Sequence, residues 1–220
     1  MSDKTLQASG PGRPKDPAKR AAILEAAKSL FLSKGYDGSS MDAIAAEAGV
    51  SKLTVYSHFT DKETLFSAAV KAKCMEQLPE LLFELPLGGT IETVLRNIGM
   101  GFQALINSSE SIELHRLMAT LGNQDPKLSK LFFDAGPQQI LNEMERLLIQ
   151  ADKAGKLRID KPINAAEHFF CLIKGGHNFR LLIGCATPLQ GEEAEQHVQE
   201  VVELFLRAYR AEDITPATRT

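Results

Sequence analysis

The sequence predicts an all-α protein with a small N-terminal domain and a larger C-terminal one. Apolar residues recur at helical spacing through most of the chain, and helix starts are marked by capping residues and by proline at the first helical position. No segment shows the sustained two-residue alternation of a β-strand, which argues against a sheet. A chain of 220 residues is long enough for one large domain or two smaller ones, each with its own core.

The first expected helix follows a polar, basic arm. Residues 1–15 lack apolar periodicity and hold glycine and proline together, so we expect this arm to be disordered. Asp16 then caps a helix with Pro17 at its first position, and Gly35 ends it. The apolar face of this helix consists of Ile23, Leu24, Ala27, Leu30 and Phe31.

Three more helices complete the N-terminal third of the chain. Two short ones are expected at about 41–48 and 52–58. The run Thr60–Glu63 has the pattern of a capping box, which predicts the start of a fourth helix. That helix should end near Gln77, because Pro79 cannot continue it without a break.

Six further helices are expected in the C-terminal domain. Asp125 and Pro126 repeat the cap-then-proline arrangement, and Gly155 lies where a helix ends. The periodicity predicts helices at about 90–106, 110–121, 126–133, 138–154, 163–183 and 192–210. We therefore expect domains at residues 16–66 and 67–212, followed by a short tail at 213–220.

Composition and charge favour a cytoplasmic protein that meets a polyanion at one end. Hydrophobic residues make up 44% and charged residues 24% of the chain, which is ordinary for a globular protein. No apolar run approaches the roughly 18 residues of a membrane span, and the first 20 residues hold no secretory signal. Residues 1–75 carry a net charge of +3 and residues 76–220 one of −6, so the basic N-terminal third is the expected contact.

The sequence argues against an enzyme and against a metal site. The motifs HExxH, GxSxG and GxGxxG and the phosphate-binding loop are absent from the sequence. The three cysteines are odd in number and widely spaced, which fits neither a disulfide framework nor a zinc site. We interpret Cys74, Cys171 and Cys185 as small apolar side chains rather than oxidant sensors, and we expect no cofactor.

Residues 41–59 have the spacing of a helix-turn-helix. Ala45 is small enough for two helices to cross closely, and Gly49 can adopt the left-handed conformation that the turn needs. Ser51 caps the second helix, whose first turn would enter a major groove. The shared apolar seam consists of Ile44, Ala48, Val50 and Val55. A helix pair without a DNA-binding role would share this seam, but not the polar second helix.

The second helix carries side chains that suit DNA reading. Lys52 can donate to guanine, Leu53 can contact a thymine methyl group, and Thr54 can serve a base or a phosphate. The candidates beyond these three are Tyr56, His58 and Lys62, expected at the DNA backbone, and Ser57 on the same helix.

The N-terminal arm adds a minor-groove candidate. Prolines at positions 11 and 14 favour an extended backbone around Arg13, and one arginine on an extended arm suits a narrow A·T-rich minor groove. The alternative is a solvated tail that adds only diffuse positive charge.

Residues 16–70 resemble the DNA-binding domain of the tetracycline-repressor (TetR) family. The resemblance is carried by Ile23–Lys34, Gly35, Tyr36, Ser39, Ser40, Met41, Ile44, Ala45, Ala48–Lys52, Thr54–Tyr56, His58, Phe59 and Lys62–Phe66. It implies a three-helix DNA-binding domain, joined by a fourth helix to a helical domain that binds a ligand and dimerises. It also implies that Ser40 caps a helix that touches phosphate. Leu53 departs from the family, because many members have glycine or proline there.

The C-terminal half resembles the AcrR/AefR-like branch of that family. The resemblance is carried by Leu117, Phe132–Pro137, Gly155–Arg158, Ala165, Ala166 and Phe169. We expect a mostly apolar ligand pocket lined by Phe102, His115, Met118, Phe133, Met144, Phe170 and His177, and for each single residue ordinary core packing is the alternative.

Two apolar helix faces are candidates for a dimer interface. The candidate residues are Phe169, Ile173, Leu181, Val198, Val201, Val202, Phe205 and Tyr209. Burial of both faces within one chain is the alternative. The glycine pairs Gly99/Gly101 and Gly175/Gly176 indicate either close helix crossings or room for a ligand beside Phe102 and His177.

The sequence thus predicts a regulator that binds a palindromic operator as a homodimer and is released by a small, mostly apolar effector. Its expected partners are double-stranded DNA, a second copy of the chain and the effector, with no membrane. The alternatives are an activator or a ligand-independent regulator of the same fold, and a helical binding module without a role at DNA.

Overall fold

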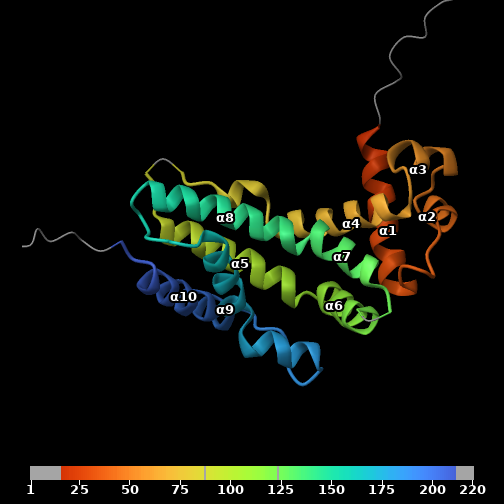
Figure 1. The fold of residues 1–220 in the computed structure, drawn as a ribbon. Coiled ribbons are helices and arrows are strands. Elements are labelled where there is room, and N and C mark those ends of the chain that lie inside the picture. Colours follow the sequence, from red (N-terminus) through yellow and green to blue (C-terminus); the bar gives the residue numbers. More distant parts are fainter. Residues whose placement is uncertain (1–15, 87, 123, 212–220) are drawn as a thin grey trace, which may run out of the picture. The chain divides into compact units, whose positions relative to one another are not determined.

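A computed structural model describes residues 16–86, 88–122 and 124–211, and these ranges are helical with no β-strand. The all-α prediction is confirmed. The chain forms two compact units that divide between Phe66 and Ser67 (Figure 1). A bridge between Leu157 and Arg210 is the one β-type pairing in the described ranges. No helix there is long and apolar enough to cross a membrane.

The first unit is built from α1 (Pro17–Lys34), α2 (Met41–Glu47), α3 (Lys52–His58) and the start of α4 (Lys62–Gln77). Its core joins the apolar face of α1 to α2, α3 and the start of α4, through side chains that include Ile23, Phe31, Ile44, Val55, Leu65 and Phe66. The α1–α2 connection is held by Ser39, whose buried hydroxyl lies 3.0 Å from the carbonyl oxygen of Leu30 and 2.7 Å from that of Gly35.

The start of α4 differs from the sequence prediction in one detail. The backbone N–H of Thr64 donates to Oδ1 of Asp61 at 2.7 Å, so Asp61 is the capping residue and not Thr60. The helix accordingly begins at Lys62. Aspartate and threonine both cap helices, and the choice between neighbouring candidates depends on backbone geometry.

The second unit contains the rest of α4, a short 3-10 helix η1 (Glu80–Phe83) and six further helices. The sequence did not predict η1, a single turn that follows Pro79. The further helices are α5 (Ile91–Asn107), α6 (Ser109–Leu121), α7 (Pro126–Ala135), α8 (Pro137–Lys153), α9 (Pro162–Leu182) and α10 (Gly191–Ala208). The predicted helices are thus all present, with ends that differ by one or two residues.

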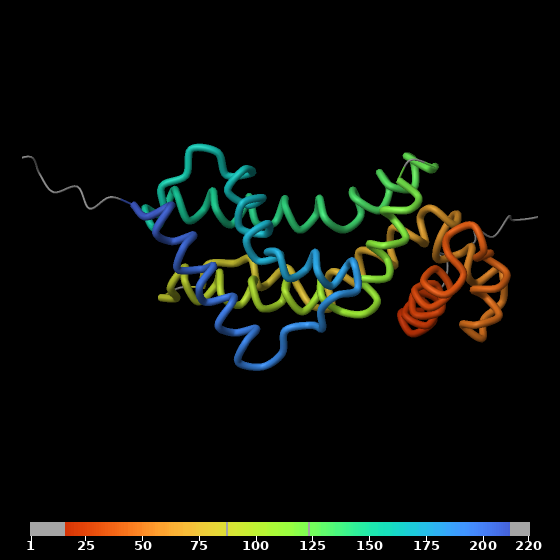
Figure 2. Tube along the Cα trace, turned by 90° about the horizontal axis from the view of Figure 1, so that it is seen from below, coloured from red at the N-terminus to blue at the C-terminus, as the bar shows by residue number. Residues whose placement is uncertain are grey.

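The core of the second unit lies between α5, α8, α9 and α10. Helix α9 packs on both α5 and α8, while α10 packs on α5 and α9, as both ribbon and trace show (Figure 1 and Figure 2). The largest side chains fully enclosed there are Phe83, Phe169, Phe205, Leu95, Ile98, Met144, Leu147 and Leu148.

The glycine pairs serve helix crossing and a kink. A methyl group on Gly99 would lie 2.7 Å from Cγ1 of Val198, and one on Gly101 would lie 2.5 Å from the carbonyl oxygen of Gln77, so α5 needs glycine at both crossings. Gly175 has φ +52° and breaks the helical path inside α9. Nε2 of His197 lies 2.9 Å from the carbonyl oxygen of Ile173 and donates to it beside this kink.

Candidate functional site

The helix-turn-helix has the geometry that its sequence predicts. Gly49 adopts the left-handed conformation, with φ +65°, between α2 and α3. Ser51 accepts a hydrogen bond from the backbone N–H of Thr54 at 3.1 Å and so caps α3. Ser40 caps α2 in the same way, accepting from Ala43 at 3.1 Å. Both caps fix the first turns of their helices. The first turn of the second helix is where base-reading side chains lie in this motif.

The first turn of α3 presents the candidate base-reading residues at the surface. Leu53 is 83% exposed, which is unusual for a large apolar side chain in a small unit. The Lys52 ammonium lies 2.8 Å from Oδ1 of Asp42, and this hydrogen bond and charge raise the pKa of Lys52 above its usual value. Lys52 therefore has a protein partner, Asp42, that DNA would have to replace. The hydroxyl of Thr54 lies 2.8 Å from that of Ser51.

The remaining α3 candidates differ in exposure. Tyr56 is an exposed ring, and the Ser57 hydroxyl donates to the carbonyl of Thr54 at 2.7 Å. His58 is half-buried, and its Nδ1 atom is enclosed without a hydrogen-bond partner among the described residues. Arg13 lies outside the described residues.

Lys62 is held inside the first unit. Its ammonium donates to the carbonyls of Tyr36 at 2.9 Å and Ser39 at 3.2 Å, and it lies 4.1 Å from the centre of the Tyr36 ring. An ammonium has three N–H donors, so at most one is left for a phosphate. The structure gives this lysine a stabilising role that its sequence position did not indicate.

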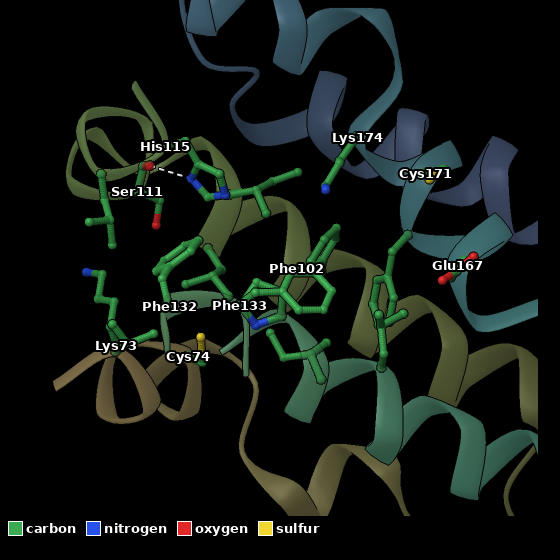
Figure 3. A pocket seen from close by; sticks show the side chains of 18 residues that line it. Lys73, Cys74, Phe102, Ser111, His115, Phe132, Phe133, Glu167, Cys171 and Lys174 are labelled. Atoms are coloured by element: carbon green, nitrogen blue, oxygen red, sulfur yellow. Dashed lines mark hydrogen bonds between the residues drawn. The ribbon is translucent and has the colours of Figure 1, made fainter. Parts of the chain in front are cut away.

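The second unit encloses a cavity of about 300 Å³ (Figure 3). Six helices, α4 to α9, contribute to it. Its lining is mostly apolar, with aliphatic side chains and four phenylalanine rings, and the rings of Phe102 and Phe170 lie 4.4 Å apart between centres. A volume near the lower end of the range for ligand pockets suits a small, compact molecule.

The cavity brings together part of the predicted pocket. Phe102, His115, Phe133 and Phe170 line it, whereas Met118, Met144 and His177 do not. Met144 is fully buried in the core, and Met118 is nearly so. His177 is on the half of α9 that follows the kink, where its Nε2 donates to the carbonyl of Thr187 at 2.8 Å.

The lining also contains polar residues that the sequence did not predict there, namely Lys73, Cys74, Ser111, Glu167, Cys171 and Lys174. The spacing of Glu167, Phe170, Cys171 and Lys174 is i, i+3, i+4, i+7, which places them on one face of α9. Two charges and a cysteine on the same face as a buried phenylalanine would have been a signal of a half-buried, functional surface.

The cysteines only partly follow the prediction that they fill apolar space. Cys74 is half-buried, and burial raises the pKa of its thiol to about 11, so it stays protonated near neutral pH. Cys171 and Cys185 are exposed. All three are free thiols.

Comparison with known proteins decides the family. Residues 23–69 match bacterial regulatory proteins of the tetR family, and residues 93–211 match the C-terminal domain of AefR-like transcriptional repressors. The chain belongs to the TetR family. Its members are transcriptional regulators that bind DNA, and they are not enzymes.

Similar full-length proteins support this assignment to the TetR family. The regulator YdeS of Bacillus subtilis (strain 168) is 27% identical over 95% of this chain and 97% of its own. A crystal structure of a TetR-family regulator from Mesorhizobium loti MAFF303099 is 30% identical, with a TM-score of 0.71, and covers 90% of this chain and all of that one. The structure of the flavonoid-responsive regulator FrrA is also 30% identical, with a TM-score of 0.68, over 89% of this chain and 98% of that one.

The apolar stripes proposed for dimerisation lie inside this TetR-family chain. Phe169, Ile173, Leu181, Val198, Val201, Val202 and Phe205 are all buried without a second copy. Tyr209 is half-buried against Phe205, and its hydroxyl lies 2.8 Å from Nδ1 of His168. The structure thus realises the alternative of burial within one chain, because α9 uses its face to pack on α5 and α8, and α10 uses its face to pack on α5 and α9.

Other large apolar side chains on the C-terminal helices are exposed. Phe179 near the end of α9, Ile183 directly after it and Leu204 on α10 are 63%, 60% and 48% exposed. These three side chains are candidates for a contact with another protein.

Proposed function

We propose that this TetR-family chain is a repressor that binds a palindromic operator as a homodimer and is released by a small, mostly apolar effector. The observation that carries the proposal is the mostly apolar cavity of the second unit, whose wall includes Val70, Lys73 and Cys74 of α4. Helix α4 begins in the DNA-binding unit, so it is a covalent path from effector to operator. An effector that prefers one position of α4 would shift the population of binding-competent dimers.

The surface of α3 supports operator reading by Lys52, Leu53 and Thr54. Leu53 offers an exposed apolar side chain to a thymine methyl group, and Lys52 offers donors to guanine once it leaves Asp42. Each copy of the chain would place one such helix in one half-site of the palindrome. The side chains that would hold the register on the DNA backbone are Tyr56, Ser57 and His58 of α3, together with Ser40, which caps α2.

The exposed residues Phe179, Ile183 and Leu204 support dimerisation through α9 and α10. We propose these exposed residues as the dimer contact in place of the apolar stripes of α9 and α10, which are buried within the chain. The helices involved are still the two that the sequence indicated. A C2 dimer would bring the same surface of each copy together. The relative FrrA is described as flavonoid-responsive, which supports a response of this chain to a small molecule too.

Selection of binding sites from random duplex DNA tests the operator. The full-length chain should enrich an inverted repeat, and Lys52→Ala should relax the preference at one position of each half-site, by about 1–3 kcal/mol on the preferred base. Lys130→Ala, which removes an exposed lysine from α7, is the matched control and should enrich the wild-type repeat. Enrichment of a single, unrepeated half-site would contradict binding as a symmetric dimer.

A further inference from the structure

Some charged groups of the cavity already have a partner in the protein, and others do not. Lys73 lies 3.7 Å from a carboxylate oxygen of Glu76 and 3.8 Å from one of Glu110, so carboxylates already balance its charge. Lys174 has no ion-pair partner within the part of the chain that the structure describes. In Figure 3 its ammonium extends from α9 towards the interior of the cavity, on the opposite side from Lys73. The ammonium of Lys174 can therefore donate hydrogen bonds to a ligand.

His115 offers the complementary group. Its Nδ1 lies 2.6 Å from the backbone carbonyl oxygen of Ser111, as the dashed line in Figure 3 shows. A carbonyl only accepts, so Nδ1 carries the hydrogen and Nε2 is the acceptor of the neutral ring. Burial, and then the positive charge of Lys174, lower the pKa of His115, which keeps the ring neutral near pH 7. The cavity lining therefore offers one acceptor, on the half-buried His115, and one donor, on Lys174, whose side chain is also exposed to solvent.

The rest of the lining is aromatic. Phe102 and Phe170 lie with their ring centres 4.4 Å apart, and Phe132 lies edge-on to His115 at 5.8 Å. Aromatic rings prefer offset or edge contacts with other rings, so planar aromatic molecules gain more here than flexible aliphatic ones.

We propose that the effector is an aromatic molecule with a hydroxyl group on its ring, which donates to Nε2 of His115 and accepts from Nζ of Lys174. This inference rests on the proposed ligand-released function and specifies its ligand class. A phenolic hydroxyl is both a donor and an acceptor, so it satisfies the two groups at once. Donation to His115 increases the negative charge on the phenolic oxygen, and the Lys174 ammonium stabilises that charge.

Other polar groups fit this pair less well. A carboxylate only accepts, so it would face the unshared electron pair of His115 Nε2. An alkylammonium only donates, and it would meet the positive charges of Lys73 and Lys174. Glu167, the one carboxylate among the lining residues, is on the exposed part of α9 and lies away from His115 in Figure 3.

Calorimetric titration of the full-length protein with four matched probes tests the ligand class. The probes are 2-naphthol, 2-methoxynaphthalene, 2-naphthoate and the saturated alcohol 2-decalol. We expect 2-naphthol to bind about tenfold more tightly than 2-methoxynaphthalene, which has the ring and oxygen but no donor. It should also bind more tightly than 2-naphthoate and 2-decalol. Equal or tighter binding of any of the other three, or no detectable binding of 2-naphthol, would overturn the proposal.

Variants assign the preference to the two residues. His115→Phe keeps a ring of similar size and should bring 2-naphthol and 2-methoxynaphthalene to equal affinity. Lys174→Met removes an exposed ammonium, should leave the fold intact and should weaken 2-naphthol several-fold. It should weaken 2-methoxynaphthalene less, because an ether oxygen that donates nothing to His115 carries less negative charge for the ammonium to stabilise. Lys153→Met, on an exposed position of α8, is the matched control and should keep the wild-type ratio. A wild-type ratio in Lys174→Met would refute the role of this lysine, even if His115→Phe failed to fold.

Release of the selected operator by the same probes separates this inference from the proposed function. If 2-naphthol binds with the expected preference but leaves the operator complex intact, the inferred ligand class is supported, and the proposal that this ligand releases the repressor from its operator is wrong. If 2-naphthoate or 2-decalol releases the operator and 2-naphthol does not, ligand release stands and the ligand class is wrong.

Discussion

The two units of this protein place their functional residues in contrasting ways. In the DNA-binding unit, Lys52, Leu53 and Thr54 are consecutive residues on one turn of α3, capped by the residue before them. In the second unit, the cavity is lined by two to four residues from each of six helices, at positions from 70 to 174. The first site is made by local hydrogen bonds, and the second exists only when the helices pack.

This difference bears on how each unit responds to substitution. A change on the surface of α3 should alter DNA binding and leave the fold intact. A change in the core between α5, α9 and α10 should alter the fold itself, and through it the cavity. Four experiments test this contrast.

Substitution of neighbouring residues on α10 should have opposite consequences. Phe205→Asp places a carboxylate in the core beside Phe169, whose ring centre lies 5.3 Å away, and should destabilise the second unit by at least about 4 kcal/mol. Leu204→Asp changes an exposed position and should leave a folded protein that sediments as a monomer. Circular dichroism during urea unfolding and sedimentation velocity provide the measurements. A stably folded Phe205→Asp would place this ring outside the core.

Gly99 tests how closely α5, α9 and α10 pack. Gly99→Ala adds a methyl group 2.7 Å from Val198 and 3.1 Å from Ile173, which should lower the free energy of unfolding by about 1–3 kcal/mol. Gly176→Ala is the matched control, because its methyl group meets only a terminal nitrogen of Arg180 at 3.5 Å. Urea titrations of both variants compare them. Equal stability of the two variants would mean that the crossing at Gly99 can relax.

Two lysines of the DNA-binding unit should separate stability from DNA binding. Lys62→Met removes the hydrogen bonds to the carbonyls of Tyr36 and Ser39, and should destabilise this unit by about 1–2 kcal/mol. Lys52→Met should leave the melting temperature unchanged, because its ion pair with Asp42 is exposed, but should weaken operator binding. Differential scanning calorimetry and operator titrations distinguish them. If Lys62→Met kept full stability and only reduced the salt dependence of binding, its ammonium would act on phosphate instead.

The smallest expected effect is a pH dependence from His115. Its pKa is lowered in the folded protein from the ordinary value of 6.5, so below pH 6.5 the unfolded chain binds more protons than the folded one. Stability should therefore fall as pH drops below 6.5, until the folded ring is protonated too. The difference in free energy of unfolding between wild type and His115→Gln, measured from pH 7.5 to pH 5 by urea titration, isolates this histidine. A difference independent of pH would contradict the burial of the ring.

The helices, and which residues of α3 are exposed, follow from the sequence alone. Helix ends follow from capping residues, as with Asp16, Ser40 and Ser51, whose partners are only two or three residues away. The turn at Gly49 follows from the conformational freedom of glycine. Exposed residues of α3 could be named because only one face of a seven-residue helix can be buried in a small unit.

Only the tertiary structure decided which apolar residues line the cavity, form the core or remain exposed. Met144 and Phe102 have the same helical signature in the sequence, yet one is enclosed in the core and the other faces the cavity. The stripe of α10 through Val198 and Phe205 could as well have met a second copy, and it packs on the chain's own helices. Periodicity shows that a face is buried but not against what, because hydrophobic burial has no preferred partner. Lys62, too, gains its two carbonyl partners from a segment more than 20 residues away.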